Sequence, residues 1–551
     1  MDHSKFSITK RERYFLSFCI LMASALVCSI ILIQSYRHEI FGTTLMLGWD
    51  SPGYVCLARY VLSKGPVHMI QAWSFPYLYV QLLAFVGYLC GDLVLVEKIL
   101  PVAFCILLIY VNSRIILKIS KSVYLAGLTA FLTVFSVNVL RVLSDLNGNL
   151  MAFSLVFTAF MLVPDLEHEK PILNKKYLSF ILILFIIACT HFETYFVLAL
   201  SFFLYGLMCR NWQKFFRLIL ALAIPVAVLV SIFPAYFFGY TKTLVIFYQP
   251  LTFGDITLWS GGSWLLIGFW ILGSCLVYKS RTRNDMLVSL VYSWSFVNLL
   301  IVVLIGPIVR EFAMRALYIM PTPLLLALAV FGFKTYLVNW QPKSILSLSK
   351  KGHSVKINVN QVLLALLVFV VMAGPIFTAI ANAEVFLTPF IPHPSYEKIV
   401  KVKEYFDAHH LSKPIVVFGG YPHVGLIALY RNYIGAEIGE HFAYYGDIPN
   451  LFRLLPSQPR VNSTTDPYLS QLERYYLTSY YYELIGNLTG PPPPMYYHDS
   501  HVTNETLMSY PILIVTPDFY TEEIPAYIKP FYIDDGMYVI PPNSINPSEI
   551  K

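Results

Sequence analysis

Apolar runs long enough to cross a membrane return throughout the first 382 residues of this chain. They lie near 14–35, 75–93, 97–117, 122–138, 149–164, 177–190, 195–209, 216–236, 263–279, 286–305, 316–338 and 360–382. A helix of about 20 apolar residues spans the roughly 30 Å hydrocarbon core of a bilayer. Of the 551 residues, 57% are hydrophobic and only 13% are charged. The sequence therefore predicts an α-helical, multi-pass membrane protein.

The positions of Lys and Arg predict how these runs are threaded, because basic residues favour cytoplasmic loops. If eleven runs cross and 75–93 does not, the basic groups all fall on the side of the N-terminus. These groups are Arg114/Lys118/Lys121, Lys170/Lys175/Lys176, Arg210/Lys214/Arg217, Lys279/Arg281/Arg283 and Lys343/Lys350/Lys351/Lys356. We therefore predict eleven crossings, a cytoplasmic N-terminus with a retained signal-anchor at 14–35, and an extracytoplasmic C-terminus. The net charge of +7 follows from this topology and does not indicate nucleic-acid binding.

Two domains are expected. Residues 1–383 form the transmembrane module, whose first outer loop, about 36–96, contains a peripheral or re-entrant helix at 75–93. Residues 384–551 form a soluble extracytoplasmic α/β domain, with strands expected at 414–420, 511–516, 531–533 and 537–540. The sequons at Asn462, Asn487 and Asn504 agree with an outer location. Gly419-Gly420 falls far short of a nucleotide-binding fingerprint, so no cofactor is expected.

With this topology, four outer loops bring ionisable and polar side chains to one membrane level. Their residues are Trp49, Asp50 and Tyr54; Arg141, Asp145 and Asn147; His191 and Glu193; and Arg310, Glu311 and Arg315. Ionisable residues at membrane depth are costly and usually serve a site. The two late arginines also lie on the side where positive charge is disfavoured. The four loops together predict a functional site.

Each residue also has a purely structural interpretation. Asp50 lies in Asp-Ser-Pro-Gly, which is good turn chemistry. Asp145 can cap the helix that follows it. His191 and Glu193 occupy a very short turn, where polar residues are expected, and Arg310 and Arg315 can extend their side chains to the interface. Only their joint occurrence favours function over structure.

The chemistry that fits these side chains is group transfer from a lipid-phosphate donor. Arginines bind phosphate through charge-assisted hydrogen bonds, and a carboxylate can deprotonate an acceptor hydroxyl. An apolar groove between helices would hold the polyprenyl chain. The sequence carries no Walker A motif, no HExxH and no GxSxG with partners.

The loop Gly48-Trp49-Asp50-Ser51-Pro52-Gly53-Tyr54, the non-crossing helix and the Arg141-x-x-Ser144-Asp145-x-Asn147 segment resemble the GT-C glycosyltransferase superfamily. Its members include oligosaccharyltransferases, protein O-mannosyltransferases and lipid-A aminoarabinose transferases, and the chain looks most like archaeal ones. The resemblance covers residues 1–383 and extends loosely to the C-terminal domain. It implies that Asp50 is the catalytic aspartate and that Arg310 or Arg315 holds the donor phosphate.

Two departures from oligosaccharyltransferases bear on metal binding. Asp145-Leu146-Asn147 lacks the second carboxylate of a DxD-type pair, and the C-terminal part has no WWDYG motif. The resemblance therefore implies an inverting, metal-independent enzyme that moves one sugar, mannose or glucose, from a dolichyl or other polyprenyl phosphate. Its acceptor would be a protein or lipid-linked glycan outside the cytoplasm.

We expect Asp50 as general base and Asp145 as a second catalytic residue, with Trp49, Tyr54, Arg141, Asn147, His191 and Glu193 binding substrate. Two alternatives stay open. One is a metal-dependent, oligosaccharyltransferase-like enzyme, which EDTA would inhibit. The other is a lipid or solute transporter, which predicts ionisable residues at the bilayer midplane and repeated halves; the sequence shows no internal repeat.

Overall fold

The computed structural model describes most of the first 387 residues and five short strands beyond them. The described residues are 9–37, 39–40, 43–44, 47, 51–67, 70, 76–144, 146–166, 175–209, 212–233, 264–279, 286–306, 310–339, 345–350, 353–387, 408–409, 415–418, 443–445, 512–515, 531–534 and 537–540. The chain divides into two compact units. The first comprises 1–39, 76–82 and 95–388, and the second comprises 40–75, 83–94 and 389–551.

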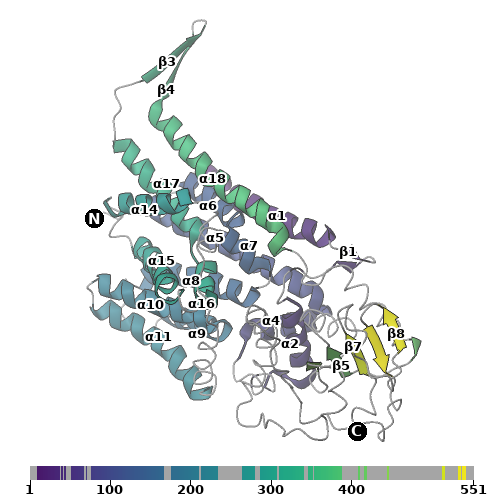
Figure 1. The fold of residues 1–551 in the computed structure, drawn as a ribbon. Coiled ribbons are helices and arrows are strands. Elements are labelled where there is room, and N and C mark those ends of the chain that lie inside the picture. Colours follow the sequence, from purple (N-terminus) through teal and green to yellow (C-terminus); the bar gives the residue numbers. More distant parts are fainter. Residues whose placement is uncertain are drawn as a thin grey trace, which may run out of the picture. The chain divides into compact units, whose positions relative to one another are not determined.

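Each of the twelve apolar runs lies on one or more helices (Figure 1). The helices are α1 (Lys10–Arg37), α2 (Ser51–Lys64), α4 (Leu78–Cys90), α5 (Leu93–Ser120), α6 (Val123–Val134), α7 (Val137–Ser144), α8 (Asn147–Leu166), α9 (Lys175–Thr190), α10 (Phe192–Cys209), α11 (Trp212–Ile232), α14 (Trp264–Lys279), α15 (Met286–Ile305), α16 (Arg310–Tyr318), α17 (Thr322–Asn339) and α18 (Val359–Phe386). Within the described residues, six helices are long and apolar enough to cross a membrane, or seven if the bent pair α6–α7 is one span. The protein is thus an integral membrane protein, and the count of eleven crossings stays a prediction.

The segment expected not to cross forms α4, which has 13 residues. At 1.5 Å per residue such a helix is about 20 Å long, well short of a hydrocarbon core of roughly 30 Å. Its length therefore agrees with a peripheral helix in the first outer loop.

The second expected outer loop is instead largely helical. Residues 137–144 form α7, which is bent by 49° from α6, and the Ser136 carbonyl accepts the first hydrogen bond, from Leu140 N. Seven of the eight α7 residues are buried. Burial of this amphipathic segment against α16 and α18 overrides the turn-forming character of its polar residues, and only residues 145 and 146 separate α7 from α8.

The expected outer loop that carries Arg310, Glu311 and Arg315 is also helical. Residues Arg310–Tyr318 form α16, and a short break at Ile319–Pro321 precedes α17. The predicted run 316–338 therefore covers the ends of two helices. The break lies where Pro321 removes a backbone donor, so the chain starts a new helix at Thr322.

An aromatic core holds α8, α9, α10 and α15 together in the first unit. Trp294 of α15 contacts Phe157 and Phe160 of α8, with ring centroids 6.4 and 6.1 Å apart, and Phe202 of α10 contacts Phe160 and Phe180 of α9, both at 5.8 Å. All five side chains are fully buried. Since lipid tails are as apolar as these rings, close packing rather than exclusion from water stabilises such an association.

Strands account for the rest of the described structure. Between α17 and α18, β3 (Ile345–Lys350) and β4 (His353–Asn358) form an antiparallel hairpin that pairs Leu348 with Val355; the sequence analysis predicted only a basic loop here. Near the N-terminus lie two short strands, β1 (Glu39–Ile40) and β2 (Thr43–Thr44).

The second unit contains a five-stranded sheet of order β6-β5-β7-β9-β8. Its strands are β5 (Ile415–Phe418), β6 (Ala443–Tyr445), β7 (Ile512–Val515), β8 (Phe531–Asp534) and β9 (Met537–Ile540). The strands β5, β6 and β7 are parallel, whereas β9 is antiparallel to β7 and to β8. Four of the five lie where the sequence predicted strands. The α/β class of this domain stays a prediction, and Gly419-Gly420 lies outside the described residues.

Candidate functional site

The predicted site residues fall into three groups. Trp49, Asp50 and Asp145 lie outside the described residues, and of Arg310 only the backbone, at the start of α16, is described. Tyr54 is half-buried on α2 in the second unit. The first unit contains the remaining five, which are Arg141, Asn147, His191, Glu193 and Arg315. The site is therefore built from the first unit alone.

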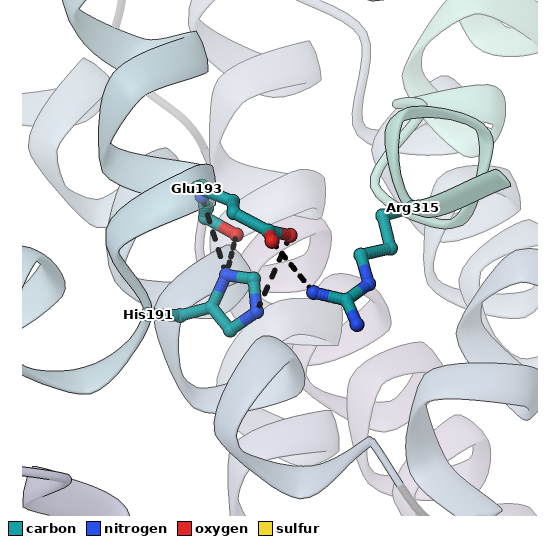
Figure 2. A network of polar contacts seen from close by, with 4 residues as sticks. His191, Glu193 and Arg315 are labelled. Carbon is teal, nitrogen blue, oxygen red and sulfur yellow. Dashed lines mark hydrogen bonds and ion pairs between the residues drawn. The ribbon is translucent and has the colours of Figure 1, made fainter. Parts of the chain in front are cut away.

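His191 forms the one-residue break between α9 and α10, as the sequence predicted for a tight turn. It caps α10: its Nδ1 accepts a hydrogen bond from the backbone N–H of Thr194 at 3.2 Å and lies 2.9 Å from Thr194 Oγ1. Because a cap atom must accept, Nδ1 carries no proton in this arrangement. The other ring nitrogen, Nε2, points toward Glu193 and lies 3.9 Å from its Oε2 (Figure 2).

Glu193 and Arg315 join helices that are 122 residues apart in the chain. Arg315 Nη1 of α16 donates a hydrogen bond to Glu193 Oε1 of α10 at 2.6 Å (Figure 2). The Glu193 side chain is 10% exposed and that of Arg315 35%, so the carboxylate is much the more deeply buried partner. Glu193 also lies in the first turn of α10, where the helix dipole favours a negative charge.

Burial lowers the pKa of His191 to about 4; the nearby Glu193 opposes this shift, whereas Arg315 adds to it. His191 is therefore neutral at neutral pH, as its role as a cap requires. Burial likewise raises the pKa of Tyr77 to about 12, with Arg315 lowering it and Glu193 raising it. Tyr77 thus lies within electrostatic range of the pair, although the sequence analysis did not select it.

Tyr77 precedes α4 with φ of +42°, in a left-handed conformation that costs a non-glycine residue about 1–2 kcal/mol. This backbone conformation sets where the Tyr77 side chain lies, and no sequence pattern predicts it. The sequence offered only its position inside the segment 75–93.

Two side chains from other helices hold the C-terminal end of α16, which carries Arg315. Asn138 of α7 donates its amide N–H to the Leu317 carbonyl, and Trp294 of α15 donates its indole N–H to the Ile319 carbonyl at 2.9 Å. The last carbonyls of a helix lack partners within the helix. The Ile319 and Met320 amides bind the Arg315 and Leu317 carbonyls, and the two side-chain donors add contacts from α7 and α15 that position the end of α16.

Arg141 is placed among aromatic rings. Its guanidinium lies 5.5 Å from the ring centre of Tyr318 and 5.9 Å from that of Phe386, within the range of cation–π attraction. Its Nη1 also donates to Ser144 Oγ at 3.3 Å. Through these contacts Arg141 connects α7 with the ends of α16 and α18.

A small cleft lies at the Arg315–Glu193 pair and contains about 250 Å³ of empty space, part of it open to the outside. Asn149, His191, Glu193 and Arg315 line it, together with the apolar Val197 and Ile301. A guanidinium has five N–H donors, so Arg315 can bind an anion while it contacts Glu193. The site therefore has a cation that can bind an anion. It also has a neutral imidazole and an amide that can form hydrogen bonds with hydroxyl groups.

Asn147, the first residue of α8, belongs to a second polar cluster. Its Nδ2 donates to Glu97 Oε1 at 2.7 Å, and the hydroxyl of Tyr79 donates to Glu97 Oε2 at 2.7 Å. All three side chains are buried. The sequence analysis missed Glu97, although an acidic residue at the edge of the apolar run 97–117 is a signal that could have drawn attention to it.

Within the part of the chain that the structure describes, no three His, Cys, Asp or Glu side chains come together as a metal site would require. Asp50 and Asp145 lie outside that part. Metal independence is thus untested and stays a prediction.

No protein-family model matches the chain, and no curated protein matches it in sequence. Solved structures do. ArnT from Cupriavidus metallidurans bound to undecaprenyl phosphate is 12% identical, with a TM-score of 0.50 over 95% of this chain and 97% of that one; its apo form gives 11% and 0.51. The archaeal oligosaccharyltransferase AglB from Archaeoglobus fulgidus, in complex with an inhibitory peptide and a dolichol-phosphate, is 12% identical, with a TM-score of 0.51 over 77% of this chain.

The chain spans 64% of the AglB chain, just under two thirds of it, whereas its match with ArnT extends over nearly the whole of both chains. Both proteins are GT-C glycosyltransferases. The resemblance inferred from the short motifs is thus confirmed at the level of the fold, which is the GT-C fold.

Proposed function

We propose that the protein is a glycosyltransferase that moves a single sugar from a polyprenyl-phosphate donor to an acceptor on the extracytoplasmic side of the membrane. The observation that carries the proposal is the shared fold over 95% of the chain with ArnT, whose structure contains undecaprenyl phosphate. AglB, with its dolichol-phosphate, adds a second lipid-phosphate neighbour of the same fold. In this chain, the cation of Arg315 beside a small cleft is what such a phosphate needs.

Arg315 is the proposed phosphate-binding residue, with Arg310 of the same helix as its partner in this role. A guanidinium matches a phosphate through two parallel N–H···O hydrogen bonds. Arg315 donates to the Glu193 carboxylate at 2.6 Å, which shows that its guanidinium is accessible to a negatively charged oxygen. The polyprenyl chain would lie along the apolar helices, and the phosphate would lie at their outer end.

In the proposed reaction Asp50 takes the proton of the acceptor hydroxyl. The acceptor oxygen attacks the anomeric carbon from the face opposite the phosphate, the bond between that carbon and the phosphate oxygen breaks, and the sugar configuration inverts. Polyprenyl phosphate leaves with the electron pair, and Arg315 stabilises its charge. The residues proposed to orient sugar and acceptor are Asp145, Trp49, Tyr54, Arg141, Asn147, His191 and Glu193.

The sugar is proposed to be mannose or glucose, and the acceptor a protein or a lipid-linked glycan. The reaction is proposed to be independent of divalent metal, because Asp145-Leu146-Asn147 offers one carboxylate where a DxD-type pair has two. Full turnover in EDTA would support this. Loss of turnover that Mn²⁺ or Mg²⁺ restores would favour the oligosaccharyltransferase-like alternative.

The first test is the variant Asp50→Asn in proteoliposomes supplied with polyprenyl-phosphate mannose or glucose and a membrane extract as the acceptor source. Removing a general base typically costs 10²- to 10⁴-fold in rate, so we expect transfer to fall by about that factor with the fold intact. Glu12→Gln, the same change at the exposed start of α1, serves as the matched control and should keep full activity. Wild-type turnover by Asp50→Asn would refute the proposed base, and lipid or solute translocation without sugar transfer would favour the transporter.

The second test separates the binding and structural roles of Arg315. Arg315→Gln leaves the buried Glu193 carboxylate without its cation, so we expect a loss of about 1–2 kcal/mol in stability, reduced because Arg315 is partly exposed. Adding Glu193→Gln to this variant should restore stability, since no buried charge is then left unpaired. Binding of radiolabelled polyprenyl phosphate should stay weakened about 10- to 100-fold in both variants. Recovery of binding in the double variant would remove Arg315 from the phosphate site.

A further inference from the structure

A buried carboxyl group, that of Glu97 on α5, connects two segments that lead to the cleft. Only 2% of this residue is exposed, and its two oxygens accept hydrogen bonds from Tyr79 and Asn147, each at 2.7 Å. A buried group of this kind is costly unless its hydrogen bonds are made. These two bonds therefore strongly constrain both partners.

Each hydrogen-bond partner of Glu97 lies two residues along the chain from a residue near the Arg315–Glu193 pair. Asn147 starts α8, and Asn149, two residues on, lines the cleft with Glu193 and Arg315. Tyr79 lies in the first turn of α4, two residues after Tyr77, the tyrosine whose pKa is affected by the charges of Arg315 and Glu193. A shift at Tyr79 or Asn147 would thus be transmitted along the backbone to both neighbours.

We propose that Glu97 is a positioning residue for the donor site, one that holds the starts of α4 and α8 so that Tyr77 and Asn149 keep their places around Arg315. The inference rests on the proposed function for its link to sugar transfer. Glu97 itself does not line the cleft, so it acts through Tyr79 and Asn147 and is not a catalytic residue.

Another buried polar pair on the same helix provides a control. Asn112 of α5 donates its amide N–H to Thr133 Oγ1 of α6 at 3.2 Å. It lies 15 residues beyond Glu97, or about 22 Å along the helix. Neither Asn112 nor Thr133 lines the cleft. Thr133→Val removes a buried hydrogen bond of the same helix without touching the segments that Glu97 holds.

The kinetic test compares Glu97→Gln, Tyr79→Phe and their combination with Thr133→Val. A misplacement of about 1 Å can cost as much as 10²-fold in rate, so we expect Glu97→Gln to lower kcat/KM for the lipid donor at least tenfold. Glutamine keeps the size of the side chain but replaces one of the two acceptor oxygens by an NH₂ group, so we expect a loss of stability no larger than that of Thr133→Val. Tyr79→Phe should have a smaller effect, and because the two residues share one bond the double variant should show less than the sum of the single effects. Thr133→Val should lose stability and keep kcat/KM.

Hydrogen–deuterium exchange tests the positioning role without any reaction. We expect the amides of 77–80 and 145–149 to exchange faster in Glu97→Gln and in Tyr79→Phe, and to be unchanged in Thr133→Val. If the wild type transfers no sugar, the proposed function fails, and this measurement alone still decides the role of Glu97. Unchanged exchange in both segments, or a variant that loses stability while kcat/KM stays at the wild-type value, would overturn the inference.

Discussion

At the scale of single residues, His191 shows how one side chain can serve both structure and site. Its Nδ1 caps α10 through the Thr194 amide, while its Nε2 faces Glu193. The capping role requires a neutral ring, and burial supplies it by lowering the pKa of the imidazole to about 4, against the opposing effect of Glu193. A protonated ring would lose the cap, because a nitrogen that carries a proton cannot accept the N–H.

This gives a prediction for pH. The pKa of His191 is lower in the folded protein than its usual value of 6.5, so the unfolded chain binds a proton more readily. The stabilisation is then complete above about pH 6.5 and is lost as the pH falls from 6.5 to 4. A shift of this size corresponds to about 3 kcal/mol, and because 19% of the side chain is exposed we expect about 1–2 kcal/mol.

The measurement is the free energy of unfolding of purified protein in detergent between pH 7.5 and 4. The matched variant is His191→Asn, whose side-chain oxygen can still cap the helix but cannot titrate in this range. We expect the variant to lose less stability than the wild type over that interval. Parallel curves for the two proteins would show that His191 does not carry the effect.

At the scale of elements, contacts at the end of a helix determine how α16 is positioned. The C-terminal end of α16 is held by Asn138 and Trp294, which donate to the Leu317 and Ile319 carbonyls. These contacts join α16 to α7 and α15, two elements far apart in the sequence. The direction of the Arg315 side chain therefore depends on residues that do not line the cleft.

Asn138→Leu should show this dependence. The change keeps the branching of the side chain but removes one of the two donors to the Leu317 carbonyl, which then accepts only from the Met320 amide; the loss of this buried hydrogen bond should cost about 0.5–1.5 kcal/mol in stability. We also expect KM for the lipid donor to rise several-fold, because α16 is less firmly held. Thermal unfolding and donor titrations provide the two readouts.

Asn298→Leu is the control for this experiment. Asn298 is as deeply buried as Asn138, but its amide donates within α15 to the Trp294 carbonyl. We expect some loss of stability and an unchanged KM. An equal rise of KM in both variants would mean that general loosening, and not the hold on α16, explains the result.

The sequence predicted elements where length and hydropathy decide, and missed those that depend on burial. Within the described residues, each of the twelve apolar runs is largely helical, because an apolar segment that crosses a bilayer must satisfy its backbone internally. By contrast, α7 and the first part of α16 were expected as loops, because they lie between apolar runs and carry polar or charged residues. Packing against other helices, which no local pattern records, makes them helical.

At the scale of the whole molecule, the topology inferred from charge is the largest untested prediction. It places the hairpin β3–β4 in the cytoplasm and the C-terminal domain outside. The last 275 residues contain no cysteine, which makes this part of the chain well suited to labelling.

We predict opposite reactivities for two introduced cysteines. In intact cells, Ser470→Cys should react with a membrane-impermeant maleimide, whereas Ser347→Cys in β3 should react only after the cells are opened. The unchanged protein provides the background from its own cysteines. Protection of Ser470→Cys, or labelling of Ser347→Cys in intact cells, would reverse the assigned orientation and move the site to the cytoplasmic side.

The sequence by itself determined that this protein is a helical membrane protein and where its apolar helices lie, apart from α7 and the start of α16, and it predicted that His191, Glu193 and Arg315 lie near one another. It could do so because both signals are local. About 20 apolar residues are enough to span a bilayer, and an ionisable residue at membrane depth is costly in free energy. Only the tertiary structure decided that Arg315 contacts Glu193, that Asn138 and Trp294 hold α16, and that Glu97 joins Tyr79 to Asn147. Hydrogen bonds between helices depend on how the helices rotate and pack, and this is set by the whole bundle and by no single segment.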